Sequence, residues 1–132
     1  MEHVTHSEAI TDGVRVHVEA RYSAEHSDPR RSEWFFLYTI RVSNEGSETC
    51  QLLSRHWIIK NGAGKVEEVR GPGVIGEQPV LEPGDAFEYT SGCPLDTPFG
   101  SMEGTYQMVR EDGRSFDAAI ERFDLKEPRA LH

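Results

Sequence analysis

Alternation of apolar and polar residues is the main pattern along this chain, and it predicts β-strands. Residues 14–22 show it most clearly, because every second position is apolar or aromatic: Val14, Val16, Val18, Ala20 and Tyr22. A period of two places these side chains on one face of a strand and the polar ones on the other. Residues 34–43 repeat the pattern, with Phe36, Tyr38, Ile40 and Val42 on one face.

Further strands and turns are expected along the chain. Residues 50–60 carry apolar side chains on both faces, Leu52 and Ile58 on one and Leu53, Trp57 and Ile59 on the other, which favours a central strand. Shorter strands are expected at residues 65–70, 86–91, 105–110 and 115–123. Turn-forming residues separate them at 44–46, 61–62, 82–85 and 112–113. The Asn61-Gly62 pair favours a hairpin with a type I′ turn.

Seven or more short antiparallel strands, without a capped apolar run at helical spacing, predict an all-β fold. The expected architecture is a single β-sandwich of the immunoglobulin-like kind. The fibronectin type III-like version is favoured, since a Cys–Trp–Cys spacing is missing. Residues 13–132 form the predicted domain, residues 1–12 are expected to be a short frayed segment, and the polar residues 23–32 a mobile loop.

Charge limits the possible partners. The chain has 14 basic and 23 acidic residues, a formal net charge of −9, so it repels phosphate backbones and anionic lipid. Nucleic acid and membranes are therefore not expected as partners. The first 13 residues lack the basic start and apolar centre of a signal peptide, so we expect a cytoplasmic protein. Cys50 and Cys93 are expected to be small buried side chains and not a disulfide.

Gly71, Gly73 and Gly76 form a GxGxxG pattern. In dinucleotide-binding folds this pattern leads into a helix whose N-terminal N–H groups hold a pyrophosphate. Pro79 and Pro83 interrupt the segment after the last glycine, so a helix is not expected here. Two interpretations remain: a loop that bends at a sheet edge, or a nest of backbone N–H groups that binds an anion with help from Arg70. Pro72 removes one N–H from such a nest.

Metal and catalytic sites have little support. His56, beside Trp57, and Cys93 are the candidate ligands, but two ligands without a third make only a weak case for a zinc or cobalt site. His3 and His6 lie in the segment expected to fray, and His17 on the polar face of its strand is expected to be solvated. No serine lies in a GxSxG elbow. We predict no catalytic residue, no bound metal and no cofactor.

Several longer segments then resemble one known family. They are QLLSRHWII at residues 51–59, EVRGPGVIGEQPVLEPGDAFEYTSGCPLDTPFGSMEGTYQMV at 68–109 and the closing PRALH. These segments are similar to the ApaG family, also called CorD. The resemblance implies a fibronectin type III-like sandwich and a bacterial origin, but no established reaction. The family names refer to cobalt tolerance and magnesium efflux, and to a neighbouring diadenosine tetraphosphate hydrolase. A related domain in eukaryotic F-box proteins has protein recognition as its inferred task.

The leading hypothesis is a non-enzymatic interaction domain. It would recognise a protein partner through an exposed sheet edge or through the loop from Arg70 to Gly76, with Arg55, His56 and Trp57 nearby. The alternative is a small-ligand binder, which takes pyrophosphate or a nucleotide at residues 71–76, or cobalt or magnesium at acidic and histidine side chains. Hydrolysis of dinucleoside polyphosphates is a third alternative, and it would need a carboxylate cluster that the sequence does not reveal. Association of copies through sheet edges stays open.

Overall fold

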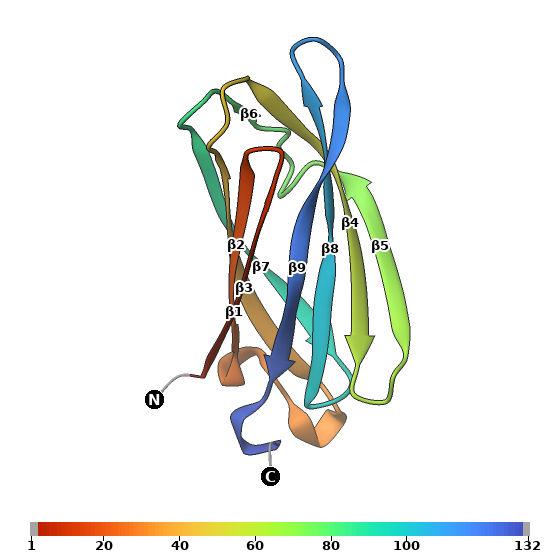
Figure 1. The fold of residues 1–132 in the computed structure, drawn as a ribbon. Coiled ribbons are helices and arrows are strands. Elements are labelled where there is room, and N and C mark those ends of the chain that lie inside the picture. The colour runs from red at the N-terminus through yellow and green to blue at the C-terminus, as the bar shows by residue number, and fades with distance from the viewer. Residues whose placement is uncertain (1–2, 131–132) are drawn as a thin grey trace.

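The computed structural model describes residues 3–130, which form two antiparallel β-sheets packed face to face (Figure 1). One sheet has the order β1-β2-β3-β7, and the other has β5-β4-β8-β9 with β6 beside β4. The predicted all-β sandwich is confirmed. The strands are β1 (Val4–Thr11), β2 (Val14–Tyr22), β3 (Trp34–Asn44), β4 (Cys50–Asn61), β5 (Val66–Pro72), β6 (Val80–Leu81), β7 (Ala86–Leu95), β8 (Phe99–Arg110) and β9 (Ser115–Lys126).

The core lies between the sheets and uses the alternating residues that the sequence indicated. On β2 and β3 the buried side chains are Val14, Val16, Val18, Ala20, Phe36, Tyr38, Ile40 and Val42. Each is at most 6% exposed, which confirms the predicted inner faces, while Tyr22, predicted on the same face, is partly buried and packs against this core. Cys50 and Cys93 are free and buried, as expected. Within residues 3–130, no helix has the length and apolar character needed to cross a membrane.

Strand β4 is central in its sheet, as predicted, because it pairs with β5, β6 and β8. The expected division of its apolar residues between two faces is wrong. The pairing with β8 shifts by one residue between Leu52 and Ser54, so Leu53 is an extra residue in the ladder. This bulge changes the alternation, and Leu52 and Trp57 are both buried in the core.

Residues 4–11 form strand β1, so the expectation of a frayed segment is wrong for them; residues 1–2 lie outside the described part of the chain. β1 pairs with β2 along its whole length. Its inward positions include hydroxyl residues that bond to the edge of β9. Thr5 Oγ1 donates to the carbonyl of Asp124 at 2.5 Å, and Thr11 Oγ1 accepts from the N–H of Ala119 at 3.1 Å. These bonds join the two sheets along one side of the sandwich.

Two connections have local structure that the sequence did not indicate. The turn after β4 is not type I′, because the positive φ of 87° lies at Gly64, whose N–H donates to the carbonyl of Asn61. The Asn61 side chain accepts from the N–H groups of Ala63 and Lys65, which shapes this longer loop. Residues 23–32, expected to be a mobile loop, contain two 3₁₀ turns, η1 (Ala24–His26) and η2 (Pro29–Arg31).

Candidate functional site

The register of β4 and β5 brings most of the predicted site residues together. Arg55 lies opposite Gly71, His56 opposite Arg70, and Trp57 opposite Val69. Since side chains alternate along a strand, Arg55 and Trp57 point toward the inner face and His56 toward the outer face. Gly73 and Gly76 lie in the loop after β5. The candidate site therefore has an inner part and an outer part on the two sides of one strand pair.

Trp57 belongs to the core. Its side chain is 3% exposed and meets three aromatic rings edge-on or nearly so, with centroids 5.5 Å from Tyr38, 6.4 Å from Tyr106 and 6.0 Å from Phe123. The buried indole therefore cannot contact a partner directly. Trp57 packs on the inner side of β4 and fixes the position of this strand.

Arg55 holds the glycine loop from the inner side. Its Nη1 donates to the carbonyl oxygens of Pro72 at 3.0 Å and Gly73 at 2.9 Å. The guanidinium lies directly against Gly71, because a Cβ added there would be 2.9 Å from Nη2 of Arg55. The absence of a side chain at residue 71 thus allows Arg55 to reach the loop carbonyls.

The inner face near Arg55 also carries buried phenols. The hydroxyls of Tyr89 and Tyr106 share a hydrogen bond. Burial raises the pKa of both groups well above the ordinary tyrosine value. Burial also raises the pKa of the Cys93 thiol to about 12. All three groups therefore stay protonated near neutral pH, and none is an activated base or nucleophile.

His56 and Arg70 form the outer part of the site. His56 Nε2 lies 2.8 Å from Oε1 of Glu68, and Nη2 of Arg70 lies 3.8 Å from the same oxygen. Arg70 has 73% of its side chain exposed, so it faces solvent. Cys93, in contrast, is a core residue of β7. Because His56 faces outward and Cys93 lies inside the sandwich, this pair does not form a ligand set.

The loop after β5 is built by its own hydrogen bonds. The N–H of Gly73 donates to the carbonyl of Leu53 at 2.8 Å, while Val74 and Glu77 exchange N–H···O bonds of 2.8 and 2.9 Å. Gly73 has φ +60°, and a Cβ there would be 2.2 Å from the carbonyl oxygen of Glu77. This glycine is thus required by the tight closure of the loop.

This geometry gives little support to the anion-binding nest, the alternative interpretation of the glycine pattern. The N–H groups of Gly73, Val74 and Glu77 are already used inside the loop. The next regular element is the short strand β6, not a helix, so no helix N-terminus faces the glycines. The glycines of the GxGxxG pattern shape a turn and a contact with Arg55.

Ile75 is the residue at this site that sequence patterns did not reveal. Ile75 and Gly76 are the two central residues of the turn closed by Val74 and Glu77, and their φ angles are +42° and +81°. Positive φ at both positions is the signature of a type I′ turn, where a β-branched residue is strained. The Ile75 side chain is 59% exposed. The glycine at residue 76 was the only local signal for such a turn.

A second group of side chains meets on the opposite edge of the molecule. His6 and His17, which the sequence assigned to a frayed segment and a solvated face, lie beside Glu19 on the β1–β2 hairpin. His3 precedes β1 and is exposed. Sequence reasoning missed this cluster because it needs the register of β1 on β2.

Comparisons with known proteins agree on one family. The ApaG domain family matches residues 24–110. The protein named ApaG of Nitrosospira multiformis is 56% identical over 119 residues, which is 90% of this chain and 94% of the relative. Protein ApaG of Methylobacterium sp. is 53% identical and covers 94% of this chain and 98% of its own. A crystal structure named as that of the ApaA protein from Bordetella pertussis superposes on this chain with a TM-score of 0.85. The two are 52% identical, and the match covers 88% of this chain and 94% of that one.

Proposed function

Because the chain belongs to the ApaG domain family, we propose that it is a non-enzymatic interaction domain that recognises a protein partner. The proposed contact surface consists of Ile75, Arg70 and the outer edge of β5. The main observation behind this proposal is the conformation of Ile75, a β-branched residue with a positive φ that is exposed to water.

Within residues 3–130, Ile75 is not among the buried or partly buried residues of the hydrophobic core, so core packing does not offset its backbone strain. A non-glycine residue held at a sparsely populated φ costs on the order of 1–3 kcal/mol. Glycine or asparagine would adopt the same turn more easily. The exposed Ile75 side chain gains little from burial in the core. An apolar group on a preformed turn is, however, a good anchor for a partner, since little ordering is needed on binding.

The hydrogen bonds beneath the turn support the same interpretation. Arg55 holds the carbonyls of Pro72 and Gly73, and the Val74 side chain is 1% exposed. The turn is therefore fixed to the sandwich from below, and Ile75 is presented outward. Preorganised contact residues of this kind raise affinity by reducing the entropy lost on association.

Strand β5 offers a second mode of contact beside the turn. It is the last strand on its side of the sheet, and its outer edge has no ladder partner among residues 3–130. Unpaired N–H and C=O groups of such an edge can accept an extended segment of a partner. Arg70 and Glu68 are exposed along this strand and would select the partner's charges.

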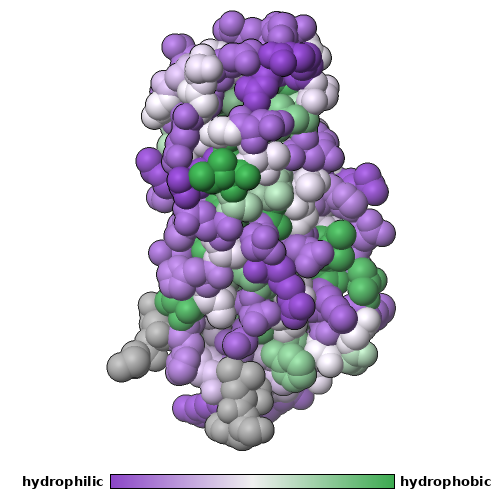
Figure 2. Space-filling model, in the orientation of Figure 1, coloured by the Kyte–Doolittle hydropathy of each residue, from purple (hydrophilic) through white to green (hydrophobic). Residues whose placement is uncertain are grey.

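The exposed hydrophobic residues of this protein lie apart from one another on its surface. The face drawn in Figure 2 is mostly hydrophilic, with small and separate hydrophobic patches. Separate apolar residues are ordinary on a protein surface, so the proposal rests on the conformation of Ile75 and on the free edge of β5, and not on a large apolar patch. Exposed anchors beside the proposed surface include Val66 at 54% and Val80 at 58%.

The protonation states of the groups near the site also favour binding over catalysis. Burial keeps the Tyr89 and Tyr106 hydroxyls and the Cys93 thiol in their protonated forms, because it raises the pKa of each. His56 is engaged with Glu68 on the outer face. These groups suit a structural role for the inner face.

Affinity capture from a bacterial lysate tests the proposal. Tagged wild type is compared with Ile75→Asp and with the matched control Ile10→Asp, which changes a 52% exposed isoleucine on the edge strand of the other sheet. We expect a discrete protein with wild type and the control, and its loss with Ile75→Asp. Equal capture by all three chains would contradict the proposal. Circular dichroism confirms that each variant is folded.

A second copy of this chain is the other possible occupant of the edge. Light scattering on wild type and Ile75→Asp decides between the two cases. A monomer in both samples agrees with a different protein as partner. A wild-type dimer that Ile75→Asp converts to a monomer would instead assign the surface to self-association.

A further inference from the structure

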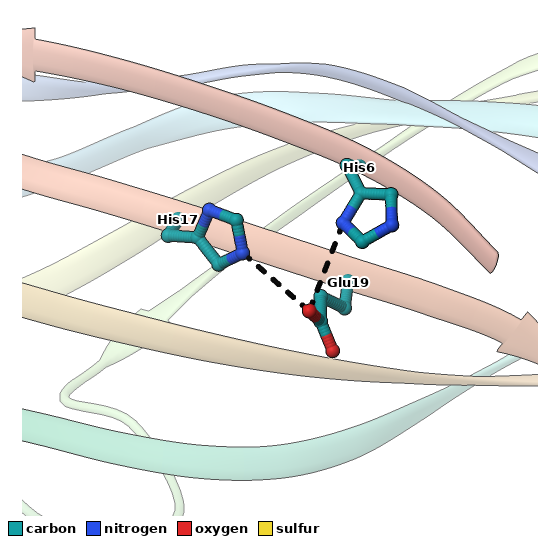
Figure 3. Close-up of side chains that lie close together, drawn as sticks. All are labelled: His6, His17 and Glu19. Atoms are coloured by element: carbon teal, nitrogen blue, oxygen red, sulfur yellow. Dashed lines mark ion pairs between the residues drawn. The ribbon is translucent and has the colours of Figure 1, made fainter.

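We propose that the outer face of the β1–β2 hairpin is a binding site for a divalent transition-metal ion such as Zn²⁺, with His6, His17 and Glu19 as ligands (Figure 3). The site lies on the edge strand β1 of the other sheet and on its neighbour β2, and does not depend on the proposed partner surface. Its ligands come from two strands that the sequence alone did not bring together.

The strand register places the three side chains on one face. His6 on β1 lies directly opposite Glu19 on β2, and His17 precedes Glu19 by two residues on the same strand. Residues two apart on a strand share a face, and cross-strand partners are close neighbours. Figure 3 shows both imidazole rings next to the Glu19 carboxylate.

The distances between the ligand atoms are close to those of a metal centre. Nδ1 of His6 and Nε2 of His17 each lie 3.7 Å from Oε1 of Glu19, and the three ligand atoms all lie within 4.8 Å of one another. With metal–ligand bonds of about 2.0–2.1 Å, ligand atoms in a tetrahedral site are roughly 3.3–3.4 Å apart. Small side-chain rotations would therefore close the site around an ion.

The backbone under the ligands is well fixed. β1 pairs with β2 from Val4 to Thr11. On its inner face Thr5 donates to the carbonyl of Asp124, and Ser7 donates to the carbonyl of Glu121 at 2.7 Å. Ligands on such rigid elements lose less entropy on binding than ligands on a loop. The exposed face leaves a fourth coordination position open to water.

Glu8 lies beside the second ring nitrogen of His17. Its Oε1 lies 3.9 Å from Nδ1 of His17, the ring nitrogen that does not face Glu19. This distance is too long for a hydrogen bond, but a small rotation would let the carboxylate accept from Nδ1–H and orient a metal-bound imidazole. Arg15 is paired with both Glu8 and Glu45, at 2.9 and 2.7 Å, which reduces its repulsion of a cation. Arg41 lies beside His17 on β3 and has Glu88 opposite it on β7.

The donor set decides the class of ion. Two imidazole nitrogens and one carboxylate oxygen suit zinc, nickel and copper. Magnesium and calcium prefer sites made only of oxygen ligands. We therefore expect Zn²⁺ to bind this hairpin and Mg²⁺ not to compete with it.

Titration calorimetry of the full chain with ZnCl₂ tests the site. We expect one Zn²⁺ per chain for wild type, no competition from MgCl₂, and affinity about tenfold or more weaker for His17→Gln and for Glu19→Gln. His56→Gln is the matched control, because it removes the other close histidine–glutamate pair and leaves the hairpin intact. His26→Gln, a further exposed histidine, should also leave the affinity unchanged.

Three results would overturn the assignment. They are no Zn²⁺ binding by wild type, unchanged affinity in His17→Gln, or an equal loss in His3→Gln, which would place the ion at the beginning of the chain instead. Thermal unfolding without metal shows whether each variant is folded. Should His17→Gln fail to fold, His6→Gln replaces it, since the His6 side chain is 55% exposed. Zn²⁺ should raise the unfolding temperature of wild type and of the controls only.

Discussion

The guanidinium of Arg55 lies across Gly71 on the neighbouring strand, where a Cβ would come within 2.9 Å of Nη2. From this position Arg55 reaches the carbonyls of Pro72 and Gly73. The contact links the register of β4 and β5 to the shape of the loop that presents Ile75. Loss of the contact should therefore affect both stability and recognition.

Gly71→Ala should destabilise the protein by about 1–2 kcal/mol, because the new methyl group displaces the Arg55 guanidinium from its two acceptors. The free energy of unfolding is measured by urea denaturation. In an Arg55→Ala background the same substitution should cost much less, since the clash is gone. An equal cost in both backgrounds would show that the two residues are not coupled.

Ile75→Gly should stabilise the protein by about 1 kcal/mol while weakening partner capture. Glycine adopts the positive φ of the turn without strain, and the exposed Ile75 side chain contributes little to the core. Ile75→Asn should act in the same direction. Urea denaturation gives the change in stability, and a lower stability of both variants would show that the turn is not strained.

Stability should fall at alkaline pH partly through Cys93. Burial, with a smaller effect of nearby Glu67, raises the pKa of this thiol from 9.0 to about 12. Above pH 9 the unfolded chain has lost this proton while the folded chain keeps it, so stability decreases by about 1.4 kcal/mol per pH unit. The decrease begins near pH 9, ends near pH 12 and is absent at lower pH.

The control for this pH effect is Cys93→Ala, which removes the titrating group. Its free energy of unfolding should depend less steeply on pH than that of wild type between pH 9 and 12, after a constant loss for the smaller side chain. Denaturation curves at several pH values give both slopes. Parallel curves would mean that the Cys93 thiol ionises equally in the folded and unfolded chains.

Thr11→Val should destabilise the protein by about 1–2 kcal/mol, because the N–H of Ala119 on β9 loses its acceptor. The side chain keeps its size, so packing is largely unchanged. Ser7→Ala is the comparison: its bond to the carbonyl of Glu121 is exposed, and water can replace the hydroxyl. Equal effects of the two substitutions in thermal unfolding would argue against a specific role of Thr11 at this edge.

Alternation along the chain predicted the sandwich because β2 and β3 bury one full face each, as Val16 and Ile40 illustrate. β1 was not recognised, since its inner positions are hydroxyl residues such as Thr5 that bond to another strand's backbone. The faces of β4 were misassigned because the bulge at Leu53 adds one residue to the ladder. These features depend on a neighbouring strand, which a local pattern does not contain.

The candidate site was likewise predicted only in part from local sequence patterns. The sequence selected the glycines and Arg55, and the register of β4 and β5 brings them together. It also selected Trp57, which is an aromatic core residue. Ile75 stayed hidden because the feature that distinguishes it is a backbone angle and not its residue type. The meeting of His6 with Glu19 required the pairing of two strands.

The central claim is that the Ile75 turn contacts a protein partner, and site-specific photo-crosslinking tests it most directly. A photoreactive amino acid is placed at residue 75 in one chain and at residue 10, a comparably exposed isoleucine, in another. After illumination in a bacterial lysate, we expect a discrete crosslinked protein from residue 75 and none from residue 10. No adduct from residue 75, or the same adducts from both positions, would contradict the account.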